Sequence, residues 1–367
     1  MYRGRDDSDL NDDERYAFKG WIGEKDFINK EPKPTFIDLT SKKVTYEMSL
    51  YPFYEIENAT ETATDLKYFS FREIRQVKLI KKKYIYPDQG DITEDPEKIT
   101  LENQYVIDIK EEYRNSISGK ITLPSADAKG RIITAVGNLG ESSKITHIFF
   151  LPSAEYQLLG GIDSSSSAFN GMTRLKLVHF PENMTSLKYI GDKCFNNNFD
   201  LVTIENLPDT VEYIGDSSFS NASKLVIQEL PKNLKYIGSM AFVNCYNLIA
   251  TVLPHGLTYL LPGVFTYCRG LQISHFGNST NGAKSPIDNN ITQIGSESFA
   301  LGRHGAEPTA IYLHNSLTYL GSGCFANYGA KDLTIYDDTD ILTIDSVLDD
   351  YFGDKTFTFN EEYDTHE

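Results

Sequence analysis

The chain repeats one arrangement of apolar and polar positions between about residue 116 and residue 345. The clearest copies read LKYIGDKCF (187–195), VEYIGDSSF (211–219) and LKYIGSMAF (234–242). Successive copies begin 24, 23, 23, 34 and 26 residues apart, and a near-constant period of this length predicts a stacked repeat architecture. A phenylalanine stands four residues after the glycine position in each copy: Phe195, Phe219, Phe242, Phe265, Phe299 and Phe325.

Each copy continues in the same way after its phenylalanine. A short polar turn is followed by a second apolar run that often ends in Leu-Pro, as in LVTIENLP (201–208) and LIATVLP (248–254). We expect glycine to permit a turn that a Cβ atom would obstruct, and proline to end the second strand. A unit of this size cannot bury both of its apolar faces alone, whereas stacked units can. The six phenylalanines are therefore predicted to anchor neighbouring units.

The full pattern, L-x-x-I-G-x-x-x-F-x-x-C-x-x-L-x-x-(I/V)-x-L-P, resembles the BspA-like (Treponema-type) leucine-rich repeat. Cys245 and Cys268 lie three residues after a phenylalanine, where that family often has cysteine. The resemblance covers residues 116–345, roughly 60% of the chain. It implies a leucine-rich-repeat solenoid that serves in adhesion or binding. The chain departs from the pattern at Leu261, where glycine is expected, and in the insertion GNSTNGAKSPIDNN (277–290).

Tyrosine recurs between the buried Leu and Ile anchors, and Gln293 interrupts the series. Side chains alternate along a strand, so we predict that these rings point away from the Ile anchors and stack about 5 Å apart as an outward ladder. One hypothesis is that the ring pairs only stabilise the sheet. The other is that the ladder is a binding stripe, because tyrosine supplies contact area at low entropic cost. The candidate binding surface is Tyr189, Tyr213, Tyr236, Tyr259 and Tyr319.

Two further residue types have structural interpretations. Asparagine stands two residues after the phenylalanine at Asn197, Asn221, Asn244 and Asn327, which turn chemistry explains. The four cysteines form no CxxC pair, so we interpret Cys194, Cys245, Cys268 and Cys324 as free core thiols.

The ends of the chain differ from the repeats. Residues 1–115 open with an acidic arm (6–14) and continue in short alternating runs, which predict a small, mainly β domain, a sandwich or a barrel, that docks to a larger assembly. The run RQVKLIKKKYIYP (75–87) is basic, and indicates an edge strand protected by lysines, a site for the acidic arm of a neighbouring chain, or a site for an anionic surface. Residues 346–367 are predicted to form a C-terminal cap and an acidic tail.

Composition limits the classes of partner. The net charge of -17 would repel phosphate backbones and anionic membranes, so we expect no nucleic-acid partner. Neither a secretory signal nor an apolar run of membrane-spanning length is visible, so we expect no membrane insertion.

No catalytic motif, nucleotide-binding loop or metal-binding spacing stands out, so we predict no catalytic residues, no cofactor and no metal site. Acidic pairs such as Asp337-Asp338 and Asp349-Asp350 match no EF-hand loop and are interpreted as solvated surface.

These features favour a non-catalytic structural and adhesion protein located in a virion. The N-terminal domain would dock to a bacteriophage particle as part of a fibre, spike, tail or head decoration, and the repeats would bind a host-surface protein or glycan. A homo-oligomer is compatible with this role. One alternative is a cellular leucine-rich-repeat adhesion protein at the cell surface or in the cytoplasm. The other is a glycan hydrolase on a β scaffold, which would need two carboxylates in one cleft.

Overall fold

The computed structural model describes the chain in segments. Side chains and backbone are described for residues 63–82, 97–139, 144–163, 167–278, 289–302, 308–329, 332–337 and 339, apart from the side chain of residue 332. For three strands, β1 (Tyr16–Gly23), β2 (Leu50–Ile56) and β20 (Thr356–Asn360), the backbone alone is described. The acidic arm and most of the predicted C-terminal cap lie outside the described residues.

The chain divides into two compact units, Met1–Glu61 and Thr62–Glu367. In the first unit β1 and β2 pair in an antiparallel arrangement. The predicted domain boundary near residue 115 differs from this division, because residues 62–115 share a compact unit with the repeats. The sandwich or barrel predicted for the N-terminal region stays a prediction.

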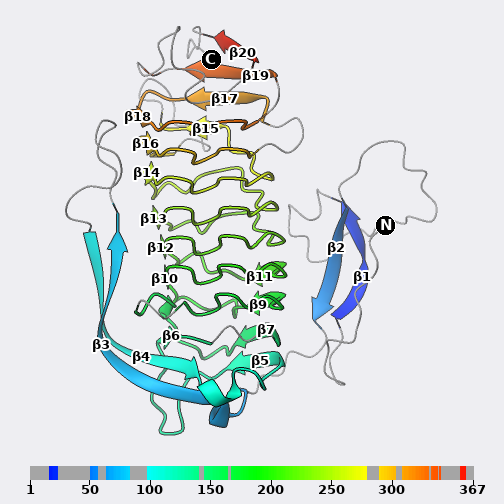
Figure 1. The fold of residues 1–367 in the computed structure, drawn as a ribbon, viewed down its shortest axis with the longest axis vertical. Helices are drawn as coiled ribbons and strands as arrows, with labels where there is room; N and C mark the ends of the chain where they lie inside the picture. The colour runs from blue at the N-terminus through cyan, green and yellow to red at the C-terminus, as the bar shows by residue number, and fades with distance from the viewer. Residues whose placement is uncertain are drawn as a thin grey trace. The chain divides into compact units, whose positions relative to one another are not determined.

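The second unit is a β-solenoid, which confirms the predicted fold class. The coils stack their short strands in two columns of parallel strands (Figure 1). The ladder column contains β6 (Ala135–Val136), β8 (Leu158–Leu159), β10 (Tyr189–Ile190), β12 (Tyr213–Ile214), β13 (Tyr236–Ile237), β14 (Tyr259–Leu260), β16 (Gln293–Ile294) and β18 (Tyr319–Leu320). The second column contains β5 (Gly119–Leu123), β7 (Ile145–Phe150), β9 (Leu177–His179), β11 (Thr203–Glu205), β15 (His275–Phe276), β17 (Ala310–Leu313), β19 (Asp332–Asp337) and β20. Between β11 and β15 the second column continues only as isolated bridges, Thr203 with Val226 and Ile227 with Leu248.

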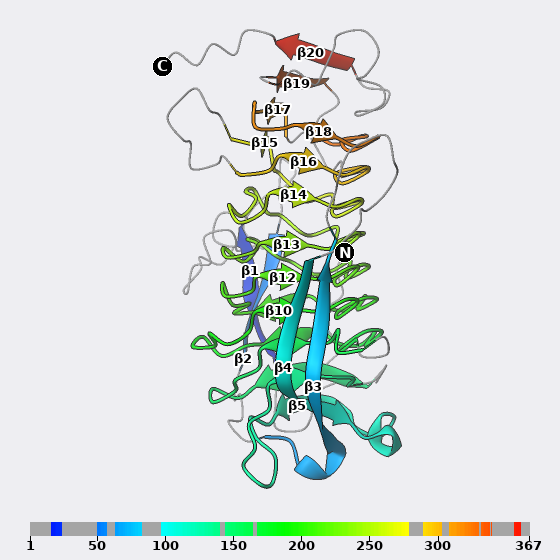
Figure 2. The same ribbon diagram turned by 90° about the vertical axis from the view of Figure 1, so that its left-hand side faces the viewer.

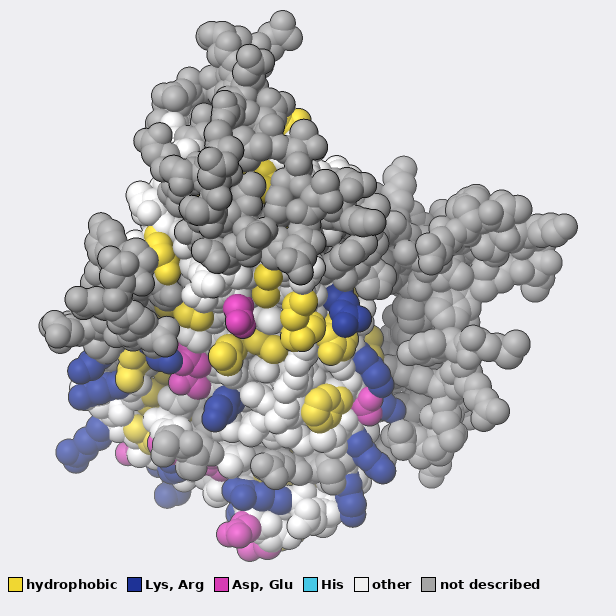
Figure 3. Space-filling model, turned by 45° about the horizontal axis from the view of Figure 1, so that its top comes forward, with side chains coloured by type: hydrophobic (Ala, Val, Ile, Leu, Met, Phe, Trp, Pro, Cys, Tyr) yellow, Lys and Arg dark blue, Asp and Glu magenta, His cyan; other side chains and the backbone are white. Residues whose placement is uncertain are grey.

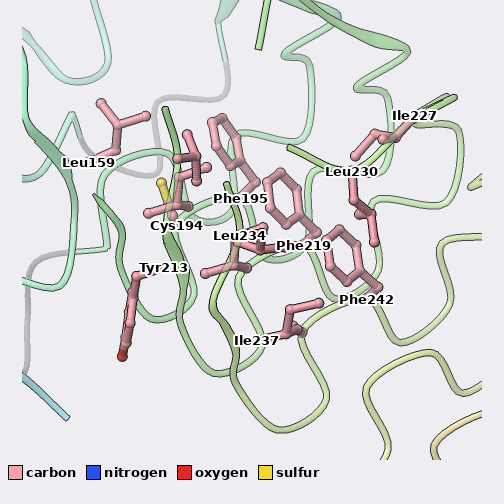
Figure 4. Packing of buried hydrophobic residues seen from close by; sticks show 14 of the residues in the cluster. Leu159, Cys194, Phe195, Tyr213, Phe219, Ile227, Leu230, Leu234, Ile237 and Phe242 are labelled. Atoms are coloured by element: carbon pink, nitrogen blue, oxygen red, sulfur yellow. The ribbon is translucent and has the colours of Figure 1, made fainter. Parts of the chain in front are cut away.

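The core between the columns contains a continuous stack of phenylalanine rings. Phe195, Phe219 and Phe242 stack face to face with ring centroids 5.1 and 5.0 Å apart, and Figure 4 shows the three rings side by side. The stack begins at Phe169 and continues to Phe325, with every predicted anchor fully buried. Offset aromatic stacking adds to the energy of burial, so the repeated phenylalanine holds the coils together.

The glycines of the repeat allow neighbouring coils to approach closely. A Cβ atom on Gly238 would lie 2.4 Å from the backbone nitrogen of Asp216 in the preceding coil, and one on Gly321 would lie 2.3 Å from that of Ser296. Real Cβ atoms do not make contacts this short. The need for glycine therefore comes mainly from coil-to-coil spacing.

A long hairpin pairs with the solenoid at its base and runs across the surface of the coils beyond it. Its strands are β3 (Phe69–Lys81) and β4 (Glu97–Ile109), preceded by the 3₁₀ turn η2 (Leu66–Tyr68) and followed by η4 (Glu111–Tyr113). At its base, β4 pairs in parallel with β6 and so begins the ladder column. Beyond Asn103, whose φ of 51° is left-handed, residues 76–82 and 97–102 run across the coils; we call these residues the strap (Figure 2).

Candidate binding surfaces

The predicted tyrosine ladder forms, but its centre is covered. Tyr189, Tyr213 and Tyr236 are in register, and the rings of Tyr213 and Tyr236 stack 4.8 Å apart. Tyr213 points away from the phenylalanine stack, as strand alternation predicts (Figure 4). However, Tyr213 is only 2% exposed and Tyr236 only 1%. The predicted outward direction is therefore right for Tyr213, but neither of these two rings is exposed to a partner.

The strap covers the ladder and bonds to it through main-chain atoms. The Tyr213 hydroxyl donates to the carbonyl of Ile80 at 3.1 Å. The backbone N–H of Lys82 donates to the Tyr236 hydroxyl at 3.1 Å, and the Tyr259 hydroxyl donates to the Lys82 carbonyl at 3.0 Å. Val77 and Leu79 of the strap are buried as well. The ladder thus binds an extended segment of its own chain.

Electrostatics at this contact keep the hydroxyls protonated. Burial raises the pKa of Tyr259 to about 12, and it raises the pKa of Tyr213 and of Tyr236 further. The ammonium group of Lys82 forms an ion pair with Asp216. At neutral pH the tyrosine hydroxyls are therefore uncharged hydrogen-bonding groups, and the charge of Lys82 is paired with that of Asp216.

The other two ladder positions are less enclosed. Tyr189 is half-buried, and its ring lies 6.5 Å from that of Tyr213 at a tilted angle. Tyr319 is also half-buried and pairs with Gln293, which separates it from the other tyrosines. The structure therefore brings four of the five predicted tyrosines into one continuous row.

The basic run in β3 lies at a sheet edge, as the interpretation of an edge strand protected by lysines requires. β3 is the terminal strand of its seven-stranded sheet. Lys81 forms an ion pair with Glu97 at 3.3 Å, and Lys78 is exposed. Lys83 lies outside the described residues.

A second surface follows the tight turns that contain the phenylalanines, and we call it the turn edge. Every one of these six turns has two residues with positive φ, two positions before and two after the phenylalanine. The position after it holds asparagine in four turns, and the amide of Asn221 donates to Asn197 at 2.8 Å while Asn244 donates to Asn221 at 2.7 Å. The predicted turn role of the asparagines is confirmed, since asparagine tolerates this backbone conformation.

Three apolar residues break this pattern in consecutive coils. Tyr267 and Leu301 replace asparagine after the phenylalanine, and Met240 occupies the position before it, all with φ between 57° and 62°. Met240 is 54% exposed, and Tyr267 and Leu301 are each 36% exposed. Tyr246 is also exposed, and the Arg269 guanidinium lies 5.1 Å from its ring centre. Hydrophobic side chains gather on the face that carries these turns (Figure 3).

Sequence reasoning missed this surface although the signal was present. Aligning the copies on phenylalanine places Tyr267 and Leu301 in the asparagine column. Turn chemistry explains the asparagines in that column, so the sequence directs attention to the tyrosine column, where the residue is regular.

A polar cleft of about 300 Å³ lies at the base of the hairpin. Its lining includes Arg72, Asp108, Arg114 and Asp163. Arg72 forms ion pairs with Asp108 at 2.8 Å and with Asp163 at 3.2 Å. Both carboxylates therefore contact a cation, which differs from the environment that raises the pKa of a glycosidase acid.

Other chemistry can be judged for the described residues alone. All four cysteines are buried free thiols, as predicted. Within the segments described, no three His, Cys, Asp or Glu side chains are grouped to hold a metal ion. In the same segments no helix is long and apolar enough to cross a membrane.

Parallel coils in register around a phenylalanine stack define a solenoid of the leucine-rich-repeat class. The model of the BspA type leucine rich repeat region matches residues 162–272 and 271–348, with six copies. These matches span half of the chain, and the chain belongs to the BspA-type leucine-rich-repeat family.

Solved structures with similar chains are also leucine-rich proteins. A leucine rich repeat protein of T. pallidum (TpLRR) is 21% identical, with a TM-score of 0.45 over 66% of this chain and 92% of that one. A leucine rich cell surface protein from Faecalibacterium prausnitzii is 18% identical, with a TM-score of 0.41 over 64% of this chain and 72% of that one. The comparison with curated proteins gives no match.

Proposed function

We propose that this chain is a non-catalytic binding protein of the adhesion type that holds a protein partner on its turn edge. The observation that supports this is the exposure of Met240, Tyr267 and Leu301 at left-handed backbone positions. The other tight turns place asparagine, glycine or another polar residue there. A left-handed conformation is unfavourable for such side chains by roughly 1–2 kcal/mol. This strain opposes folding, and a partner that covers the exposed part of these side chains gains apolar contact.

The composition of the surface favours a protein over a glycan. Tyrosine and arginine are the residues most often found at the energetic centre of protein interfaces, and methionine adapts to irregular apolar surfaces. Arg269, held over the ring of Tyr246, supplies one cation beside the apolar residues. The partner we expect therefore presents apolar side chains with a nearby carboxylate.

The test replaces Tyr267 and Leu301 together by Asn, the residue that the chain itself uses at this position. Labelled wild-type and variant chains are applied to an array of immobilised cell-surface and extracellular-matrix proteins and to a glycan array. We expect protein binding by the wild type and at least about tenfold weaker binding by the variant, with an unchanged or higher melting temperature.

A matched control is Phe199→Ser, which removes an exposed aromatic side chain from an earlier tight turn. Equal losses from the control and the double variant would contradict a specific site on the turn edge. Binding to glycans alone would overturn the protein partner.

For the larger assembly, we propose the bacteriophage virion that the sequence favours, with the N-terminal unit as the docking module. Support for this comes from the sequence alone, and a cellular adhesion protein is the alternative. Sedimentation of the native species from its source distinguishes them. Co-purification with particles in fixed stoichiometry would support the virion, and a free monomer would contradict it.

A further inference from the structure

The ladder column is interrupted between β13 and β14. In the coils before this point, the backbone N–H at the glycine position donates to the preceding coil, from Gly215 to Ile190 and from Gly238 to Ile214, at 2.8 Å each. Residues 234–261 are all described, yet β13 and β14 belong to different sheets and Leu261 makes no such bond. We call this junction the joint.

Two sequence changes at the joint explain the interruption. Leu261 stands where other copies have glycine, and at the spacing of those copies a Cβ atom at this position would collide with the preceding coil, as the positions of Gly238 and Gly321 show. Pro262 stands where Asp216 and Ser239 donate backbone N–H groups to a carboxylate of the previous coil. Proline has no N–H group to donate. The joint therefore lacks two backbone N–H donations that earlier coils make directly after their ladder strand.

The joint stays connected along the turn edge and through the core. The backbone N–H groups of Met240, Phe242 and Asn244 donate across it to the carbonyls of Pro262, Val264 and Thr266 at 2.9–3.1 Å. The phenylalanine stack also continues across it, with ring centroids 5.5 Å apart. In contrast, the tyrosine rings change from a stacked pair before the joint to an edge-on pair at 77° across it. The Gln272 N–H also donates to the Ala250 carbonyl across the joint at 3.2 Å. The two coils are thus bonded elsewhere, whereas the strands β13 and β14 do not pair with each other.

The strap connects these two strands. A single residue, Lys82, accepts a bond from Tyr259 through its carbonyl and donates one to Tyr236 through its N–H. These two tyrosines lie on opposite sides of the joint. The ammonium group of Lys82 is paired with Asp216 one coil earlier. The two coils are therefore linked through the main chain of Lys82 and the hydroxyls of Tyr236 and Tyr259. This link takes the place of the direct coil-to-coil bonds that are missing at Leu261 and Pro262.

We propose that Tyr236, Tyr259 and Asp216 form an intramolecular binding site for Lys82, and that its occupation clamps the joint. The clamp would also fix the turn edge, because Met240 and Tyr246 lie before the joint and Tyr267 and Leu301 lie after it. This last consequence rests on the proposed function, whereas the clamp does not.

The test separates the hydroxyl groups from the apolar cover that Val77 and Leu79 provide. Tyr236→Phe with Tyr259→Phe keeps both rings and removes both bonds to Lys82. Hydrogen exchange is then measured at the amides of Met240, Phe242 and Asn244, which bond across the joint. We expect exchange there to accelerate by about tenfold or more, since local opening becomes easier when these bonds are lost. The reference amides of Phe195 and Phe219, which bond across earlier coils, should keep their rates.

Two further variants make the result specific. Tyr189→Phe removes a ladder hydroxyl outside the strap contact and should leave the joint amides unchanged. Leu261→Gly restores the glycine of the repeat, and in that background the double tyrosine variant should accelerate exchange by much less. Unchanged joint amides in the double variant, or equal acceleration with and without Leu261→Gly, would overturn the clamp. Because exchange is measured without any partner, a failed search for a partner leaves this result intact.

Discussion

The ladder and the turn edge present two kinds of repetition on one solenoid. The ladder is regular in sequence, with tyrosine in coil after coil, and its centre is buried under the strap. The turn edge is regular in the first coils, where asparagines bond to one another, and irregular where Tyr267 and Leu301 replace them. In this chain the constant column supports structure, and the departures from a column mark the surface that we propose for a partner.

The largest predicted effect is a loss of stability at alkaline pH, and it should come from the buried ladder tyrosines and not from the turn edge. Burial raises the pKa of Tyr213 and Tyr236 far above the usual value of about 10, so their contribution to stability is complete below pH 10 and is lost as pH rises above it. At pH 12 the two together should lower the free energy of unfolding by about 5 kcal/mol. Chemical denaturation at pH 8 and pH 12 measures this difference. A variant with both tyrosines replaced by Phe should show a smaller loss, and an equal loss would contradict the assignment.

The phenylalanine stack offers the next largest effect. Phe242→Ala should leave a cavity between coils and lower the free energy of unfolding by roughly 3–5 kcal/mol. Urea melts of the full chain measure the loss. Phe199→Ser, on an exposed ring, should change stability far less, and a loss below about 1 kcal/mol for Phe242→Ala would contradict the anchoring role.

A smaller effect is expected when the coil spacing is disturbed. Gly238→Ala places a Cβ atom 2.4 Å from the backbone nitrogen of Asp216, and the strain should cost roughly 1–3 kcal/mol. Gly130→Ala is a poor control because its φ is 77°, although nothing surrounds it. Ala222→Gly is a better control, because it changes a buried residue of a neighbouring coil by the same single methyl group. Thermal melts that place Gly238→Ala at or above wild type would refute the close-approach argument.

The smallest effect compares the asparagine column with its exceptions. Asn221→Leu should lose about 1 kcal/mol, because leucine tolerates the left-handed backbone poorly and cannot join the amide ladder. Leu301→Asn should gain a few tenths of a kcal/mol up to about 1 kcal/mol. Differential scanning calorimetry of both variants gives the signs. A stabilising Asn221→Leu would mean that the column is not held by backbone conformation.

Much of the solenoid could be predicted from sequence because its contacts recur at a fixed spacing. The phenylalanine stack, the buried cysteines and the asparagine turns all follow from one repeated pattern. The strap could not be predicted in this way. Lys82 meets Tyr236 across 154 residues, and the segment that carries it shows no repeat. A single pairing of this kind leaves no periodic signal, so the sequence does not show that the ladder is covered.

Leu261 is a case in which the sequence shows a departure from the repeat but does not show its structural consequence. The sequence reveals that glycine is missing from one copy, but the consequence depends on how closely coils pack in space. The distances at Gly238 and Gly321 show that a Cβ atom at this position would collide with the preceding coil at the usual spacing. The sequence shows that leucine replaces glycine at this position, but only the structure shows that β13 and β14 do not pair there.

The strap also limits how the protein can change in length during evolution. Repeat proteins gain and lose whole units by duplication, and each unit contacts only its neighbours. Here the strap spans from the hairpin base to Tyr259, and its reach matches the number of coils between them. Inserting or deleting a coil within that span would shift Lys82 off its partners. Copies added after β14 would leave the contact undisturbed, so we expect relatives that keep this hairpin to vary in repeat number mainly towards the C-terminal end.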